Sequence, residues 1–278
     1  MHNWLKNQNV VLSGASGGIG RELCKILIEK YGANVIGIGR NQDKMLSLKT
    51  ELGKNADKFS YYLFDVSQRA NWSAFCADLK NKNTEIALLI NNAGAFPTFQ
   101  KTEDTSPDTI RRIMEINFFS ATYAIEQCIP ALKGDKKNKP AIVNVCSSAA
   151  LCTVVGTSAY SASKAALKAY TETLQMETKD TYIGIVYPGT TATELFRNDE
   201  HTKNSALDIV AMPAQTMAKK IARKILKKKK RAVIGWDAKL MNLTAKLMPI
   251  KGTALIAWVM KISKSKVFAD VFDYKKEK

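Results

Sequence analysis

The chain has 278 residues, 46% hydrophobic and 24% charged, a globular balance in a chain long enough to bury a core without disulfides or metal ions. Two His, at positions 2 and 201, argue against a His-based nucleophilic triad and a multi-His zinc site, so we expect no metal. The net charge is +17, and residues 201–278 carry +14 of it, with 19 Lys and Arg against 5 Asp and Glu. A nearly neutral body is therefore followed by a basic C-terminal quarter.

Short apolar strands alternate with segments of helical periodicity from residue 9 onward. Predicted strands occupy residues 9–13, 34–38, 59–64, 86–90, 141–145, 182–187 and 232–235. Predicted helices occupy residues 19–30, 42–52, 71–79, 107–132 with an interruption at Pro130, 158–179 and 217–226. This alternation favours right-handed crossovers and an α/β fold with a doubly wound parallel sheet of about seven strands. We expect a single domain over residues 1–236 and a basic helical extension over residues 237–278.

The first predicted strand leads directly into a glycine-rich turn. Gly14, Gly18 and Gly20 are spaced G-x-x-x-G-x-G between this strand and the following helix. Glycine permits a tight turn and lets backbone N–H groups approach a pyrophosphate, which the helix N-terminus stabilises. Because the turn joins a strand to a helix within a crossover unit, it predicts a dinucleotide-binding site rather than a turn without a ligand.

The end of the second predicted strand bears on which dinucleotide is bound. A site selective for NAD(H) places an acid there to bind the ribose hydroxyl groups, and residues 35–41 contain no Asp or Glu. Arg40 instead offers a planar cation suited to a 2′-phosphate, with a solvated surface Arg as the alternative. We therefore expect NADP(H) to be preferred over NAD(H).

Six further motifs follow the glycine turn in order. They are Phe64-Asp65-Val66, Asn91-Asn92-Ala93-Gly94, Met114-Glu115-Ile116-Asn117, Ile142 to Ser147, Tyr160-Ser161-Ala162-Ser163-Lys164, and Pro188-Gly189 followed by Thr193. With them the chain resembles, over roughly residues 8–193, a short-chain dehydrogenase/reductase with a Rossmann-type sheet. There are two small departures, Ser13 where the family usually has Thr and Cys146 where it often has Ser.

The resemblance implies hydride transfer between a nicotinamide cofactor and a carbonyl compound or secondary alcohol. It assigns catalysis to Asn117, Ser147, Tyr160 and Lys164, with Ser148 as a second candidate for the serine. The implied cofactor site comprises Gly14, Ser16, Gly17, Gly18, Ile19, Gly20, Arg40, Asp65, Val66, Asn92, Ala93, Gly94, Tyr160, Lys164, Pro188, Gly189, Thr191 and Thr193.

The chemistry of these residue types agrees with that assignment. A Tyr has a pKa of about 10, and the Lys164 ammonium, one helical turn away, is expected to lower the pKa of Tyr160. Ser147 would hydrogen-bond the substrate oxygen, and Asn117 would anchor a water that relays protons to Lys164. Asp65 is expected either beside the adenine or as the cap of the third helix.

The region after the Pro-Gly turn bears on the substrate. Leu195, Phe196 and the residues up to Met212 are expected to form a lid, whose apolar side chains indicate either a lipophilic or acyl-type substrate or ordinary lid packing. The resemblance also implies a homodimer or homotetramer packed through the helices at 107–132 and 158–179. A non-enzymatic NADP(H)-binding or membrane-associated scaffold protein is the alternative to an enzyme.

Two segments of the basic C-terminal quarter are amphipathic or apolar. Residues 239–248 are amphipathic, with Leu240, Leu243 and Leu247 apolar and Lys239 and Lys246 charged, and residues 253–262 form a strongly apolar run. These segments predict either docking on an anionic membrane surface, or a cover over the pocket or a subunit interface. Nucleic acid is not expected as a partner, because no aromatic side chains interrupt the Lys run at 227–231.

The cysteines and the N-terminal residues bear on the compartment. Five Cys without a C-x-x-C pair favour a reducing environment. Residues 1–9 lack the apolar segment of a signal peptide, and no run reaches the ~18 apolar residues of a membrane-spanning helix. We expect a cytoplasmic protein, or one that is peripheral at the inner face of a membrane.

Overall fold

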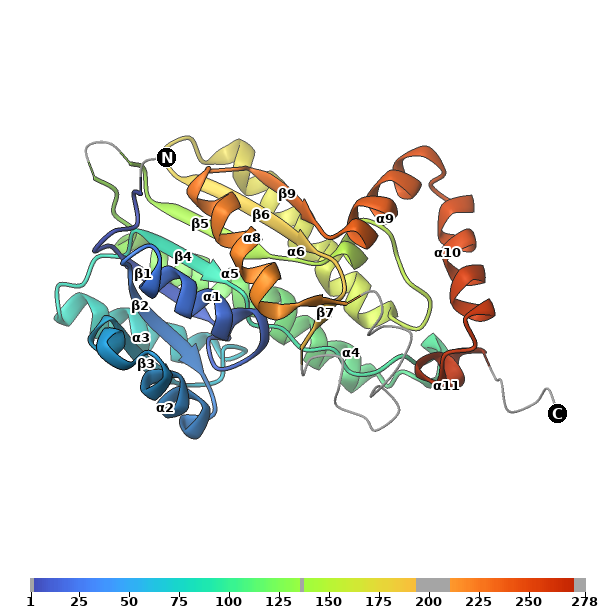
Figure 1. The fold of residues 1–278 in the computed structure, drawn as a ribbon, viewed down its shortest axis with the longest axis horizontal. Coiled ribbons are helices and arrows are strands. Elements are labelled where there is room, and N and C mark those ends of the chain that lie inside the picture. Colours follow the sequence, from blue (N-terminus) through green and yellow to red (C-terminus); the bar gives the residue numbers. More distant parts are fainter. Residues whose placement is uncertain (1–2, 136–137, 194–210, 273–278) are drawn as a thin grey trace.

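A computed structural model describes residues 3–135, 138–193 and 211–272 (Figure 1). The main strands are β1 (Asn9–Ser13), β2 (Asn34–Gly39), β3 (Phe59–Leu63), β4 (Leu88–Asn91), β5 (Ala141–Val145), β6 (Tyr182–Pro188) and β9 (Arg231–Ile234). They form one parallel sheet in the order β3-β2-β1-β4-β5-β6-β9. The order reverses between β1 and β4, and such a reversal leaves a crevice at the carboxyl ends of the strands.

Helices cover both faces of this sheet (Figure 1). One face carries α1 (Gly18–Glu29), α2 (Gln42–Glu51) and α8 (Ala214–Leu226), and the other carries α3 (Arg69–Asn81), α4 (Pro107–Met114), α5 (Ser120–Cys128) and α6 (Ser158–Glu177). β1 shows the division, because Val10 and Leu12 belong to the first core and Val11 to the second. Burial on both faces explains why the strands are nearly continuous apolar runs.

The predicted α/β fold with a seven-stranded, doubly wound parallel sheet is confirmed, and most of the predicted elements differ in their bounds. The strand expected over residues 86–90 begins at Leu88, because Ile86 forms an isolated bridge with Leu132. The single helix expected over residues 107–132 is divided by a π-helical turn at Glu115–Phe119 and ends in a 3-10 turn at Ile129–Ala131. A π-helical turn inside a helix often marks a functional position.

The chain after β9 forms the predicted basic helical extension. It contains α9 (Trp236–Leu247), α10 (Lys251–Ile262) and α11 (Ala269–Phe272). α9 and α10 form a hairpin that projects beyond the sheet at the right of Figure 1. The hairpin is tightly closed, since a Cβ on Gly252 would lie 2.6 Å from Cγ2 of Thr244. None of the helices in the described ranges is long and apolar enough to cross a membrane.

A second, small sheet flanks the segment predicted as a lid. β7 (Thr191–Ala192) pairs in parallel with β8 (Met212–Pro213). Residues 194–210, which include Leu195 and Phe196, lie outside the described residues, so the lid stays a prediction.

Candidate active site

A cavity of about 790 Å³ lies along the carboxyl edge of the sheet. The segments that follow β1, β4, β5 and β6 form one side of it, and α9, α10 and Phe268 contribute to the other. Because all seven strands end at this edge, residues far apart in the sequence meet here. Every site residue predicted from the sequence lines the cavity except Gly20 and Asn117, which lie behind its wall.

The glycine turn has a backbone that favours glycine. Gly14 and Gly18 have φ values of +68° and +54°. A Cβ on Gly20 would lie 2.0 Å from the carbonyl oxygen of Gly14, so α1 packs directly on the turn. Among the residues that the structure describes, a Cβ on Gly17 would meet nothing within 4 Å, and no side chain caps α1. The first N–H groups of α1 therefore suit an anion in the cavity.

Ser13 joins the glycine turn to the segment after β4. Its hydroxyl accepts hydrogen bonds from the backbone N–H groups of Asn92 and Ala93, both at 3.0 Å. The side chain of Asn92 donates in return to the carbonyl oxygens of Ser13 and Gly14, at 3.1 and 3.4 Å. The side-chain hydroxyl of Ser13, which the Thr usual in the family also has, thus holds two cavity-lining segments together.

Asp65 and Arg40 lie at the end of the cavity formed after β2 and β3. The Oδ1 atom of Asp65 accepts the backbone N–H of Ser67 at 3.0 Å and the Ser67 hydroxyl at 2.8 Å. Burial raises the pKa of Asp65, but these hydrogen bonds and the charge of Arg40 outweigh it and lower the pKa below its ordinary value. The alternative role of Asp65 as the cap of α3 does not hold, because the residue at that position is Gln68.

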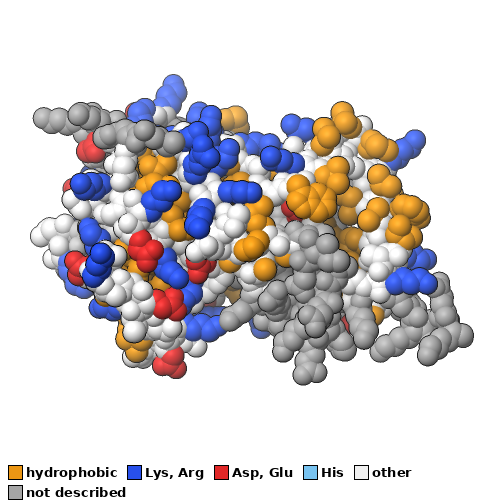
Figure 2. Space-filling model, viewed as in Figure 1, with side chains coloured by type: hydrophobic (Ala, Val, Ile, Leu, Met, Phe, Trp, Pro, Cys, Tyr) orange, Lys and Arg blue, Asp and Glu red, His pale blue; other side chains and the backbone are white. Residues whose placement is uncertain are grey.

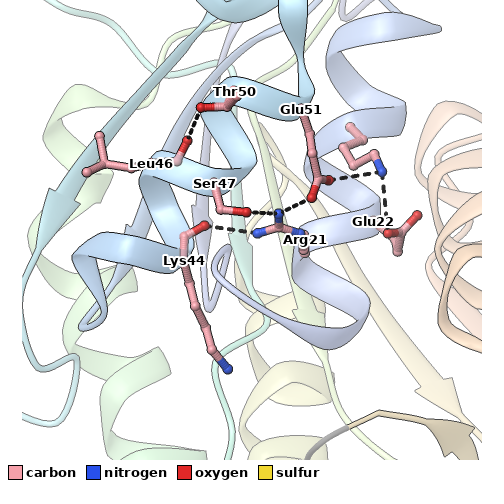
Figure 3. Close-up of polar contacts among 8 residues, drawn as sticks. Arg21, Glu22, Lys44, Leu46, Ser47, Thr50 and Glu51 are labelled. Carbon is pink, nitrogen blue, oxygen red and sulfur yellow. Dashed lines mark hydrogen bonds and ion pairs between the residues drawn. The ribbon is translucent and has the colours of Figure 1, made fainter.

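A contact between α1 and α2 fixes the helix that follows Arg40 (Figure 3). Arg21 of α1 donates to the carbonyl oxygen of Lys44 and to the hydroxyl of Ser47, each at 2.9 Å, and to the carboxylate of Glu51. The side chain of Lys44 points away from this cluster, and Lys44 lines the cavity beside Arg40. The sequence reasoning missed Lys44, and its spacing of four residues from Arg40 was the available signal.

Ser147 and Tyr160 meet in the middle of the cavity. Their side-chain hydroxyl groups are hydrogen-bonded to each other. Ser147 lies just beyond the end of β5, where its Oγ also accepts the backbone N–H of Ala149 at 3.2 Å. Tyr160 lies in the first turn of α6 and is 5% exposed. Ser148 also lines the cavity, but Ser147 is the serine that contacts Tyr160.

Lys164 follows Tyr160 by one turn of α6. Its Nζ lies 5.9 Å from the centroid of the Tyr160 ring and donates to the carbonyl oxygen of Val145 at 3.4 Å. The side chain is buried, and burial lowers the pKa of Lys164. An ammonium group has three donors, and Lys164 lines the cavity. Its remaining donors can therefore serve a bound group that carries hydroxyls.

The sequence predicts that Lys164 lowers the pKa of Tyr160, and for the protein without its cofactor this prediction is wrong. Burial raises the pKa of Tyr160 to about 12, and the hydrogen bond with Ser147 opposes this only in part. Desolvation disfavours the phenolate, and it outweighs the attraction of the Lys164 ammonium at this separation. Tyr160 is therefore a neutral hydroxyl, the form that can donate a proton.

Asn117 lies in the π-helical turn behind the cavity wall. Its Oδ1 accepts the backbone N–H of Ala95 at 2.7 Å, and its Nδ2 donates to the Ala95 carbonyl at 2.9 Å and to the Ser163 hydroxyl at 3.0 Å. The side chain therefore joins the segment after β4 to α6. The water relay expected for Asn117 stays a prediction.

An acid on α9, which the sequence reasoning missed, packs against the Pro-Gly turn. The Oδ2 atom of Asp237 accepts the backbone N–H of Thr190 at 2.6 Å. A Cβ on Gly189 would lie 2.1 Å from the Oδ1 atom of the same carboxylate. The contact joins residues 47 positions apart, so no local pattern could have identified it.

The cavity becomes apolar beyond Tyr160. Phe96 packs edge-on against Tyr160 and Phe99, and Phe99 packs edge-on against Phe268. The hairpin completes this wall with Leu240, Met241, Leu255, Ile256, Val259 and Met260. The C-terminal extension thus covers the pocket, which was one of the alternatives expected for it.

Comparisons with known proteins agree with this architecture. The sequence profile described as short chain dehydrogenase matches residues 8–204. The chain is 30% identical over 260 residues to a 3-ketodihydrosphingosine reductase of Bos taurus, covering 88% of this chain and 77% of that protein. It is 28% identical over 261 residues to the probable short-chain type dehydrogenase/reductase VdlC of Helicobacter pylori, covering 86% and 92% of the two chains.

Solved structures show the same fold at lower identity. A short chain dehydrogenase/reductase of Burkholderia phymatum in complex with NAD aligns with a TM-score of 0.76 and 18% identity, over 92% of this chain and 96% of that one. A short chain dehydrogenase of Shigella flexneri complexed with NADP aligns with a TM-score of 0.75 and 20% identity, over 86% and 100%.

A doubly wound sheet with an open glycine turn and a buried Ser–Tyr–Lys set defines an oxidoreductase that uses a nicotinamide cofactor and acts on a small molecule. The chain belongs to the short chain dehydrogenase family. Its residues fit that cofactor, because the Gly17 backbone opens on the cavity and Lys164 presents buried donors to it.

Proposed function

We propose that the chain is an NADP(H)-dependent enzyme that interconverts a lipophilic carbonyl compound and its secondary alcohol. One observation carries the proposal. The Ser147–Tyr160 hydroxyl pair lies in one continuous cavity, between the glycine turn at one end and an apolar chamber at the other. A carbonyl oxygen placed at this pair would lie between cofactor and apolar substrate.

The cofactor would be held along the polar part of the cavity. The glycine turn and the N-terminus of α1 would bind the diphosphate, Lys164 the nicotinamide ribose, and Thr191 and Thr193 the carboxamide. The other proposed contacts are Ser16, Ile19, Asp65, Val66, Asn92, Ala93, Gly94, Pro188 and Gly189. When bound, the nicotinamide ring supplies or accepts a hydride.

The side chains of this protein would manage the charge on the substrate oxygen. Ser147 and Tyr160 can both donate to that oxygen and stabilise the negative charge that develops on it. Because Tyr160 is neutral at ordinary pH, its hydroxyl proton can pass to the oxygen as the carbonyl is reduced. The buried Lys164 ammonium then stabilises the phenolate that remains, and Asn117 positions the segment facing Lys164.

The choice of NADP(H) rests on the charges at the adenosine end. Arg40 and Lys44 line the cavity there, and residues 35–41, which include most of β2 and the two residues after it, contain no acid. A 2′-phosphate is doubly charged, so two cations favour it over a ribose hydroxyl.

The substrate class rests on the apolar chamber. Phe96, Phe99 and Phe268 form its inner wall, and the α9–α10 hairpin supplies aliphatic side chains. The Bos taurus relative is named for a ketone on a long-chain base. A long-chain ketone is therefore the substrate class we propose, with the carbonyl at Ser147 and Tyr160 and the chain along the hairpin.

The assembly and the location are part of this proposal. A homodimer or homotetramer would pack through α5 and α6, where Phe119 in the preceding turn, Ile129 and Met176 are exposed. A peripheral position at the inner face of a membrane agrees with the +14 charge of residues 201–278.

The test is a screen of ketones and secondary alcohols, long-chain ketones included, that follows NADPH absorbance. Tyr160→Phe should lower kcat about a thousandfold, because the proton donor is lost, while fluorescence titration shows NADPH bound with little change. A variant that keeps a near-native rate would contradict the role of Tyr160. Cofactor binding without turnover across the panel would favour the non-enzymatic scaffold instead.

A further inference from the structure

The α9–α10 hairpin presents two apolar surfaces that point in different directions. Its inner surface lines the cavity, through Met241 and Ile256 among others. Its outer surface, which lies outside the cavity lining, is formed by Leu243, Leu247, Ile250, Trp258 and Ile262. Leu247 and Ile250 are 71% and 84% exposed, at the tip of the hairpin. Large apolar side chains that gather on the surface of a monomer are characteristic of an interaction site.

Lysines surround this outer surface. Figure 2 shows apolar side chains gathered over the hairpin with Lys and Arg at its rim, and the exposed lysines of the segment are Lys239, Lys246, Lys251, Lys261 and Lys264. Asp237 is the single acid among residues 236–264, and its carboxylate is engaged by Thr190 inside the protein. Two copies of this surface would bring Lys against Lys, whereas an anionic lipid surface has the complementary charge.

The cavity reaches the surface along the same hairpin. Leu240, Leu255 and Val259 line the cavity, and each is also about half exposed. An apolar path therefore runs from the outer surface of the hairpin into the chamber beside Tyr160. The close approach of Gly252 to Thr244 joins the two helices near the tip, so the hairpin can act as one rigid body.

We propose that the outer surface of the hairpin docks on an anionic phospholipid membrane and that a lipophilic substrate enters the cavity from the bilayer past Leu240, Leu255 and Val259. Apolar residues, a Trp and flanking lysines are the features of a helix that lies in a membrane interface. Docking rests on the hairpin alone, whereas substrate entry also rests on the proposed function.

Co-sedimentation with vesicles tests docking without any reference to activity. The full chain should bind vesicles of phosphatidylcholine with phosphatidylserine, bind vesicles of phosphatidylcholine alone more weakly, and dissociate as salt shortens the Debye length. Leu247→Glu should weaken binding tenfold or more, and Lys251→Glu about fivefold or more. The matched controls are Leu46→Glu and Lys49→Glu on the exposed face of α2, which should leave binding unchanged.

Two results would overturn docking. One is that the unmodified chain stays in the supernatant with phosphatidylserine vesicles at low salt. The other is that Leu247→Glu, in the absence of lipid, converts an oligomer into a smaller species in analytical ultracentrifugation. That second result would make the outer surface of the hairpin a contact between copies of this chain.

Activity measurements separate substrate entry from the proposed function. A short water-soluble ketone and a long-chain ketone carried in phosphatidylserine vesicles are compared at equal protein concentration. Leu247→Glu should retain kcat/KM for the soluble ketone within about twofold and lose tenfold or more for the vesicle-borne one. Equal rates of the variant and the unmodified chain on vesicle-borne ketone would overturn substrate entry and leave the proposed function standing. Vesicle binding without turnover of either ketone would overturn the function, and substrate entry with it, but leave docking standing.

Discussion

Asp237 accepts the backbone N–H of Thr190 at 2.6 Å and thereby fastens the first turn of α9 to the loop that follows β6. Its carboxylate lies so close to Gly189 that any side chain there would collide with it. The loop therefore depends on the C-terminal extension for its position. One carboxylate links the proposed nicotinamide end of the cavity to the hairpin that covers the substrate end.

Removing this carboxylate should loosen the loop. Asp237→Ala leaves the partly buried N–H of Thr190 without its charged acceptor, which costs about 1–3 kcal/mol, and we expect KM for the cofactor to rise about tenfold. Asp237→Asn keeps an acceptor oxygen and should recover most of the loss. Cofactor titration and thermal unfolding of both variants measure the effect, and equal cofactor affinity in Asp237→Ala and the unmodified chain would contradict it.

The two adjacent serines should differ sharply in their importance. Ser147 is hydrogen-bonded to Tyr160, so Ser147→Ala removes one of the two proposed donors to the substrate oxygen and should lower kcat about a hundredfold to a thousandfold. Ser148→Ala should change kcat less than about tenfold. Steady-state kinetics of the pair decide the matter, and a larger loss for Ser148→Ala would transfer the role to that residue.

The buried Tyr160 should make stability depend on alkaline pH. Burial raises its pKa to about 12, whereas an unfolded Tyr ionises at about 10. The unfolded state loses the proton first, so this contribution to stability is intact below pH ~10 and is lost as the pH rises towards ~12. Over this pH range the free energy of unfolding should therefore fall by about 2–3 kcal/mol less in Tyr160→Phe than in the unmodified chain. Urea titrations of both cofactor-free proteins measure the difference, and parallel pH curves would rule out burial as the dominant effect.

The sheet was predictable because buried parallel strands are continuous apolar runs between turns. β1 and β5 begin and end at the predicted residues, and the glycine turn was recognisable from local spacing alone. The π-helical turn at Glu115–Phe119 was not, because it is accompanied by contacts from Asn117 to Ala95 and Ser163, which are distant in the sequence.

The direction of the Tyr160 pKa shift is a second property that could not be predicted from the sequence. The i,i+4 spacing of Tyr160 and Lys164 indicates a cation near the phenol, but it does not reveal how deeply both groups are buried. Desolvation depends on packing from Phe96 and other segments, and it decides the sign. The apolar wall from α9 and α10 was likewise unpredictable in detail, because it depends on how the extension folds back over the sheet.

The preference for NADP(H) can be tested at Arg40. This side chain lines the cavity, as Lys44 does, at the proposed adenosine end, and a charge-assisted hydrogen bond to a 2′-phosphate is worth roughly 1.5–3 kcal/mol. Arg40→Ala should therefore lower kcat/KM for NADPH about tenfold to a hundredfold and leave kcat/KM for NADH within about threefold, since NADH lacks that phosphate. The control, Arg111→Ala, removes an exposed Arg that pairs with Asp108 away from the cavity. It should leave the ratio of kcat/KM for NADPH to kcat/KM for NADH unchanged. Better use of NADH by the unmodified chain, or an unchanged ratio in Arg40→Ala, would show that Arg40 is a solvated surface residue.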